Sequence, residues 1–193
     1  MKVAIIKYDA GNIRSVTFAL ERIGISPVIT DDPDEISSAD KIILPGVGEA
    51  SSAMSYLKEK KLDRVILSLT QPTLGICLGM QVMCKFSEEG NTDCLGIFDL
   101  VVKKFNDTLK VPQIGWNRIF NLKTDLFRNI NENEFMYFVH GYYAGSGENI
   151  IATTNYGIDY SSALKKNNFY AVQFHPEKSG NVGQRILENF IAL

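Results

Sequence analysis

One cysteine of the sequence lies where a reactive side chain is expected. Cys77 is flanked by glycines in the run Gly75–Gln81, which follows the apolar stretch Pro72–Ile76. This pattern predicts a buried strand that turns sharply into a helix, a geometry that exposes a nucleophile above a sheet. The start of that helix at Leu78 would point backbone N–H groups at the sulfur, which favours a thiolate and holds an oxyanion. The alternative is a small buried thiol without a chemical role, so the hypothesis needs a partner base.

The chain has two histidines that are candidates for this base. His175 follows the aromatic, alternating stretch Phe169–Phe174, which predicts a strand that ends at the histidine. Because residues two apart in an extended chain face the same side, Glu177 would orient the imidazole while His175 takes the thiol proton. His140 ends the predicted strand Phe135–Val139 and has no carboxylate two residues away, so we expect a structural role for it.

The elements that would position these residues alternate between strands and helices in the first half of the chain. We predict strands at Lys2–Lys7, Pro27–Thr30, Lys41–Leu44 and Pro72–Ile76, and helices at Asn12–Ile23, Ala50–Lys60 and Leu62–Leu69. The second half is richer in strands of antiparallel character, at Gly96–Phe105, Glu134–His140, Ile150–Thr154, Ser162–Lys165 and Phe169–Phe174, before a helix at Val182–Ala192. The pattern indicates an α/β fold with a central mixed sheet flanked by helices, which binds ligands at the carboxyl ends of its strands.

Composition limits the classes of function. A net charge of -2 and an isoelectric point near 5.7 give no sign of a surface for nucleic acid or an anionic membrane. The three cysteines, Cys77, Cys84 and Cys94, show neither metal-ligand spacing nor an even disulfide set, which is typical of the reducing cytoplasm. The N-terminus reads as a short strand and not as a signal peptide, and no apolar run is long enough to span a bilayer. We expect a single domain over residues 1–193, without cofactor or metal.

Motifs along the whole chain carry a resemblance to one enzyme family. They are Ala10–Val16, Leu44–Gly48, Gly75–Gln81, Gly115–Asn117, Tyr137–His140 and Gln173–Gly180. With them the sequence resembles the class I (triad) glutamine amidotransferases, and within that family it looks closest to the glutaminase subunits of imidazole glycerol phosphate synthase. The resemblance implies a flavodoxin-like version of the α/β fold. It also implies that Cys77, His175 and Glu177 hydrolyse the side-chain amide of L-glutamine through a thioester.

The resemblance assigns a role to the loop Pro45–Gly48. It would be an oxyanion strand, in which a backbone N–H from around Val47 joins that of Leu78 to stabilise a tetrahedral intermediate. The resemblance further implies that this peptide reorients before the oxyanion hole is complete, a movement that Gly46 and Gly48 on either side of Val47 make easy. The alternative is a tight turn, for which glycines are common.

Three further residues would contact the substrate if the resemblance holds. Gln81, one helical turn after Cys77, would bind the glutamine; the alternative is a solvated helix side chain. Gly141 and Tyr142 would offer backbone groups to the α-carboxylate and the amine. Relatives often carry Ser or Thr at position 141, so any hydroxyl contact there is lost in this chain, whereas backbone contacts remain.

The resemblance also implies a partner. Ammonia released into bulk water would be protonated. A cyclase with a (β/α)8 barrel, joined to this chain in a heterodimer, would instead receive it to make imidazole glycerol phosphate and aminoimidazole carboxamide ribonucleotide. The resemblance assigns roles in docking this partner to Asn12, Trp116, Tyr137 and Lys178. The alternatives are that Asn12 caps a helix, that Trp116 lies in the core and that Lys178 is a solvated charge.

Rival functions stay open at this point. One is a glutaminase that serves another acceptor, in an aminodeoxysugar or pyridoxal phosphate pathway. Another is a cysteine peptidase, although the His-Pro-Glu orienter and the loop Pro45–Gly48 are not typical of peptidases. The third is a catalytically silent binding module, against which the presence of Cys77, His175 and Glu177 argues.

Overall fold

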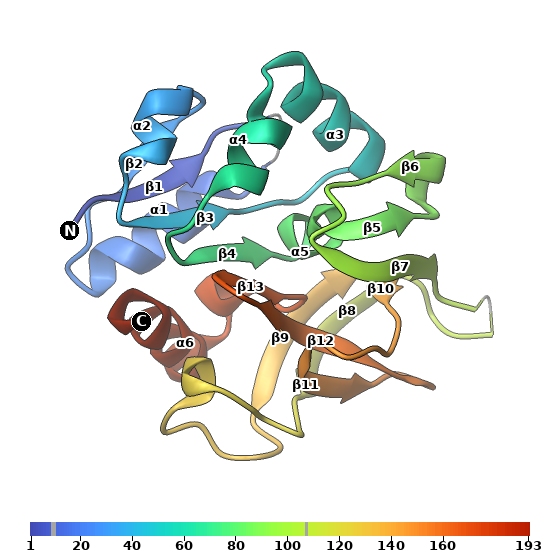
Figure 1. Ribbon diagram of the computed structural model, residues 1–193. Helices are drawn as coiled ribbons and strands as arrows, with labels where there is room; N and C mark the ends of the chain where they lie inside the picture. Colours follow the sequence, from blue (N-terminus) through green and yellow to red (C-terminus); the bar gives the residue numbers. More distant parts are fainter. Residues whose placement is uncertain (9–10, 107) are drawn as a thin grey trace.

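Five parallel strands form the centre of the fold (Figure 1). The computed structural model describes residues 1–8, 11–106 and 108–193, so Ala10 of the motif Ala10–Val16 lies outside the described residues. The strands lie in the order β2-β1-β3-β4-β13. Every residue of the last four is buried, as expected for parallel strands that are covered on both faces. Their bounds are Val28–Thr30, Val3–Ile6, Lys41–Leu44, Thr73–Ile76 and Phe169–Val172.

Helices cover both faces of these strands. In Figure 1 the helices α2 (Pro33–Ser37), α3 (Ala50–Glu59) and α4 (Leu62–Ser68) lie above the sheet, and α1 (Ile13–Arg22) and α6 (Gly180–Ala192) lie below it. Successive residues of a strand point to opposite faces, so β1 contributes to two separate cores. Ala4 and Ile6 belong to the core that the sheet forms with α2, α3 and α4. Val3 and Ile5 belong to the core that it forms with α1 and α6.

The sheet continues beyond β13 with mostly antiparallel strands. Next to β13 lie β12, β10, β7, β5 and β6, and β11 pairs with β12, which makes 11 strands within the described residues. β8 and β9 form a separate antiparallel pair, whose buried side packs against the core that contains α1 and α6. The bounds are Asp159–Lys166 (β12), Tyr142–Ala144 (β10), Phe98–Lys104 (β7), Cys84–Ser87 (β5), Thr92–Asp93 (β6), Ile150–Asn155 (β11), Gln113–Arg118 (β8) and Phe135–His140 (β9).

The predicted α/β fold with a mixed sheet is confirmed, and several boundaries differ. The strand predicted to run to Phe174 ends at Val172. The elements α2, β5, β6, β8 and β10 were not predicted. Helix α2 spans only five residues and buries one apolar side chain, Ile36, so it has no helical periodicity to detect, although Asp32 caps it by accepting N–H bonds. None of the helices in the described ranges has the length and apolar character needed to cross a membrane.

Candidate active site

The backbone at Cys77 makes the strand-to-helix turn that the sequence predicts. Cys77 lies between β4 and α5 (Leu78–Met83), with φ 52° and ψ -105°, a region that costs a non-glycine residue strain. Its N–H donates to the Val172 carbonyl at 2.8 Å, which ties the turn to the end of β13. A Cβ on Gly79 would overlap the carbonyl oxygen of Leu44, so only glycine lets α5 start this close to β3.

His175 and Glu177 form a buried pair beside the turn. The His175 Nδ1 atom lies 2.7 Å from Glu177 Oε1, and neither side chain is exposed. The pairing was predicted, but the reason given for it was wrong. The two residues do not share the face of a strand, because β13 has already ended and Pro176–Lys178 form a 3-10 turn, η3.

The charge state of His175 depends on Cys77. Burial alone would lower the pKa of His175, but the charge and hydrogen bonding of Cys77, with those of Glu177, outweigh burial and raise it to about 10. The Nε2 atom is buried and, among the described residues, makes no hydrogen bond within ordinary geometric limits, although Cys77 lies close enough to act on the ring. At neutral pH the ring therefore holds a proton whenever the sulfur is a thiolate, and Nε2 is the atom left to transfer it.

Two further side chains hold this pair in place, and the sequence reasoning did not assign them that role. Asn12 Nδ2 donates to Glu177 Oε1 at 2.5 Å and lies 3.5 Å from His175 Nδ1. Asn12 occupies the N-cap position of α1, yet its side chain makes no cap bond within the described residues, so the capping alternative is wrong. Ser179 Oγ donates to the His175 carbonyl at 2.7 Å and accepts the Tyr137 N–H at 2.9 Å, which fixes η3 against β9.

The N–H group expected to form an oxyanion hole is occupied in this structure. The Leu78 N–H donates to the Gly46 carbonyl oxygen at 3.3 Å. An oxyanion formed at Cys77 would compete with that carbonyl for the same donor. The Leu78 donor becomes free only if the Gly46 carbonyl moves, and the reorientation that the resemblance implies stays a prediction.

The loop is held in this orientation on both sides of Gly46. The Val47 carbonyl accepts the Gly11 N–H at 3.2 Å, and the buried Tyr8 hydroxyl donates to the Pro45 carbonyl. Gly48 has φ 134°, a conformation that favours glycine. A change of the peptide around Val47 thus exchanges specific hydrogen bonds and is not a free rotation.

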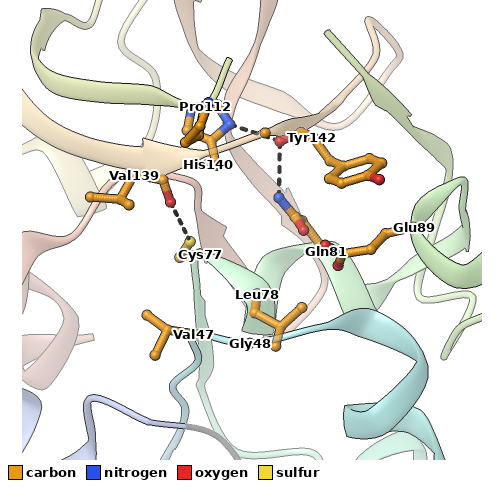
Figure 2. Close-up of a pocket in the computed structure, with 11 residues that line it drawn as sticks. Val47, Gly48, Cys77, Leu78, Gln81, Glu89, Pro112, Val139, His140 and Tyr142 are labelled. Carbon is orange, nitrogen blue, oxygen red and sulfur yellow. Dashed lines mark hydrogen bonds between the residues drawn. The ribbon is translucent and has the colours of Figure 1, made fainter.

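A cavity of about 250 Å³ opens beside Cys77 (Figure 2). Its wall contains six of the residues predicted to bind substrate or oxyanion, whereas Gly46, His175 and Glu177 do not line it. The lining residues are Val47, Gly48, Cys77, Leu78, Gln81, Glu89, Pro112, Val139, His140, Gly141 and Tyr142.

Gln81 and Glu89 supply polar groups to the cavity. Gln81 is buried, and its Nε2 donates to the Tyr142 carbonyl at 3.0 Å and to Gln173 Oε1 at 3.1 Å, so the solvated-side-chain alternative is wrong. Glu89 was not predicted, because the pair Glu88-Glu89 reads as solvated charge. Burial raises the pKa of Glu89, against the effect of the Ala50 N–H bond. Among the described residues, no cluster of three or more His, Cys, Asp or Glu side chains is suited to a metal ion.

His140 forms part of the cavity wall as a neutral, hydrogen-bonded ring. Its Nδ1 lies 2.7 Å from the Tyr142 carbonyl, and since a carbonyl only accepts, Nδ1 carries the proton. Nε2 lies 3.2 Å from the Tyr160 hydroxyl. Burial lowers the pKa of His140 to about 4, although the bond to Tyr142 opposes that change. These contacts are those of a satisfied structural histidine.

Two of the four predicted docking residues, Trp116 and Tyr137, lie on the outer face of the β8–β9 pair. Trp116 is 55% exposed, so the alternative that it lies in the core is wrong. It stands opposite Tyr137, with ring centroids 5.8 Å apart. Ile114 and Phe135 are exposed on the same face. We call these four residues the aromatic face; Lys178 is exposed on the adjoining η3 turn.

Known proteins resemble this chain along its whole length. Residues 5–193 match the family Glutamine amidotransferase class-I. The chain is similar to imidazole glycerol phosphate synthase subunit HisH of Bacteroides fragilis, with 58% identity and 100% of both chains covered. It is 48% identical to the protein of the same name from Haemophilus influenzae, covering 99% of this chain and 97% of that one. A glutamine amidotransferase from Thermotoga maritima shares the fold, with a TM-score of 0.66, 19% identity and coverage of 100% and 83%.

The lowered pKa of His140 predicts a pH dependence of stability. A folded-state pKa near 4 against about 6.5 in the unfolded chain contributes stability that is present above pH 6.5 and lost as the pH falls towards 4. The free energy of unfolding that is lost from this group is of the order of 3 kcal/mol. The raised pKa of His175 contributes stability that is already complete below pH 6.5, so it does not interfere in this window.

We expect His140→Phe to be less stable than the wild type at pH 7 and to lose less free energy of unfolding between pH 6.5 and 4. Urea unfolding at four pH values in this range, on both proteins, measures the difference in slope. Parallel curves would show that His140 is not the group that titrates.

Proposed function

The chain belongs to the class I glutamine amidotransferases and, within them, to the HisH family, and we propose that it is the glutaminase subunit of imidazole glycerol phosphate synthase. It would hydrolyse L-glutamine to glutamate and ammonia, for use by a cyclase subunit in histidine biosynthesis. The observation that carries the proposal is the Cys77 turn at the wall of a cavity, with the His175–Glu177 pair close to Cys77. We further propose that residues 1–193 are one glutamine amidotransferase type 1 domain and act in the cytoplasm, in keeping with three free cysteines.

The proposed reaction has two halves. The Cys77 thiolate attacks the side-chain amide carbon of glutamine, and the resulting tetrahedral oxyanion collapses as His175 Nε2 gives its proton to the leaving nitrogen. Ammonia departs and a thioester remains. His175 then takes a proton from water, the hydroxide attacks the thioester, and collapse of the second intermediate releases glutamate and restores the thiolate. Glu177 holds the ring through Nδ1 in both halves.

The cavity offers groups of the right charge for the amino-acid end of glutamine. The Glu89 carboxylate would pair with the α-ammonium group, and Gln81 would accept from the same group, because both of its side-chain N–H bonds are already used within the protein. Backbone groups of Gly141 and Tyr142 would hold the α-carboxylate. With these groups bound, the side-chain amide of glutamine extends towards the sulfur.

The occupied N–H of Leu78 supports control by the partner. With Gly46 in its present orientation, the oxyanion hole lacks a donor, and loss of one such donor costs about 3–4 kcal/mol of transition-state stabilisation. A cyclase that favours the reoriented loop would therefore raise glutamine hydrolysis. This ties ammonia release to the presence of the subunit that consumes it.

The aromatic face of β8 and β9 is the surface that we assign to the cyclase, a (β/α)8 barrel in a heterodimer. Large exposed apolar side chains that adjoin one another mark interaction sites, and Trp and Tyr are frequent at the centre of interfaces. Lys178 lies on the adjoining η3 turn, and Asn12 contacts the Glu177 carboxylate of the same turn. Docking there would act directly beside the triad.

The triad makes the first functional prediction. Cys77→Ser should abolish glutamine hydrolysis in the assembled synthase, because an alkoxide is far harder to form than a thiolate at neutral pH. His175→Ala should be nearly as damaging, and Glu177→Gln less so, because the amide still hydrogen-bonds the ring. His140→Phe tests the alternative base. Loss of activity in a folded His140→Phe variant with an active His175→Ala would reverse the assignment of the base.

The second functional prediction concerns Glu89. Glu89→Gln should raise KM for glutamine about tenfold, the effect of losing one charge-assisted bond, and change kcat little. Glu88→Gln is the control, because that exposed carboxylate does not line the cavity. Steady-state kinetics on both variants decide the matter. A fall in kcat with unchanged KM would place Glu89 outside the substrate site.

The third functional prediction concerns the partner. Titrating cyclase loaded with its ribonucleotide substrate into the chain should raise the glutaminase rate by roughly a hundredfold, since a bias of ~3 kcal/mol holds the competent loop to about one per cent. Trp116→Ala should require at least about tenfold more cyclase for half-maximal activation and reach the same plateau.

Leu67→Ala is the control for this titration, because Leu67 is a similarly exposed apolar residue on α4. Full activity of the lone chain would end the proposal of loop control. An unchanged half-maximal concentration for Trp116→Ala would move the docking surface elsewhere.

A further inference from the structure

The sulfur of Cys77 has a hydrogen-bond donor that does not belong to the triad. Among the described residues, two polar atoms outside the triad contact Sγ: the Val139 carbonyl oxygen at 3.7 Å and Gln173 Nε2 at 3.5 Å. A thiol can donate to the carbonyl, but a thiolate can only accept. The Val139 contact therefore favours the protonated sulfur, and the Gln173 contact favours the charged one.

The orientation of the Gln173 amide follows from a fixed acceptor. The Tyr142 carbonyl cannot donate, so the Gln81 side chain must turn its NH2 group towards it. The second hydrogen of that NH2 group then points at Gln173, which must present its oxygen. The NH2 group of Gln173 is left facing Cys77. Rotating either amide by half a turn would set two donors or two acceptors against each other.

Burial restrains the Gln173 amide and separates it from the substrate. Gln173 has no exposed surface, so its amide cannot exchange its partners for water. The Gln173 N–H donates to the Ser162 carbonyl at 2.9 Å, which also fixes the backbone. Gln173 does not line the cavity, so its side chain acts on the sulfur and not on the glutamine.

We propose that Gln173 is a further residue of the catalytic site, whose side-chain N–H, oriented by Gln81, donates to the sulfur of Cys77 and holds it as the thiolate. The inference rests on the proposed role of Cys77 as nucleophile. Gln81 is the positioning residue of the pair. Together they add a neutral donor to the His175 imidazolium, which also stabilises the thiolate.

The test is the pH dependence of Cys77 alkylation by iodoacetamide in the full chain, followed by mass spectrometry of the Cys77 peptide. Gln173→Met keeps the length of the side chain and removes the donor. The midpoint, the pH at which Cys77 is alkylated at half its maximal rate, should rise by about one unit. This is the shift expected when a charged group loses one hydrogen bond. Gln173→Glu should move it further, because a carboxylate then faces the sulfur. Gln113→Met, which alters an equally buried glutamine that bonds Tyr160 instead, should leave it in place.

Activity of the assembled synthase gives a second reading. Gln173→Met should lower kcat about tenfold, as the thiolate fraction falls, and leave KM for glutamine within about twofold. If circular dichroism shows that Gln173→Met does not fold, Gln81→Met replaces it, since it frees the amide of Gln173 to rotate and should also raise the midpoint. An unchanged alkylation midpoint in the folded variant, or, for Gln173→Met, a change in KM alone, overturns the proposal.

A labelling experiment distinguishes failure of the proposed function from failure of the inference about Gln173. The wild-type chain with its partner should be labelled at Cys77 by a diazo-ketone analogue of glutamine. If that labelling fails, Cys77 is not the glutaminase nucleophile, whatever the iodoacetamide midpoints are. If it succeeds and the midpoints of the Gln173 variants do not move, only the inference about Gln173 is wrong.

Discussion

The parallel pairing of β4 with β13 is the constraint on which the whole site depends. These neighbours are in register from Phe169 opposite Thr73 to Val172 opposite Ile76, so both end at the same level of the sheet. Cys77 leaves one strand and the segment that carries Gln173 and His175 leaves the other, at the spacing of roughly 5 Å between adjacent strands. Cys77, His175 and Gln173 are thus brought together by the ladder of backbone hydrogen bonds.

The strain at Cys77 is offset by the packing around that ladder. A residue in such a backbone conformation costs about 1–3 kcal/mol and persists only where its surroundings determine it. Here both flanking glycines are in close contact: a Cβ on Gly75 would lie 2.8 Å from Met83 Sδ, and Gly79 touches the carbonyl of Leu44. Helix α5 is therefore pressed onto the ends of β3 and β4. This packing fixes the backbone at Cys77, and with it the position of the Cβ atom that carries the sulfur.

Local patterns in the sequence were enough to predict the turn at Cys77 and the association of His175 with Glu177. Both depend on a few consecutive residues: small ones around the cysteine, and a histidine with a carboxylate two positions on. Contacts between distant segments were not predictable in this way. Asn12 lies 165 residues before Glu177, whose carboxylate it contacts, and Glu89 enters the cavity from a short turn that has no periodicity. The strand β8 was missed because its apolar residues, Ile114 and Trp116, are exposed, whereas its opposite face carries Gln113, Gly115 and Asn117.

The aromatic face of β8 and β9 has a consequence for how much of this chain a cell can usefully make. A pair of strands with exposed tryptophan, isoleucine and phenylalanine side chains is a place where identical molecules adhere to one another when nothing else covers it. Surplus chains would be lost to self-association or proteolysis, whereas those in matched amounts with a partner would be protected. If the aromatic face binds the partner as we propose, the same surface penalises unequal synthesis of the two proteins.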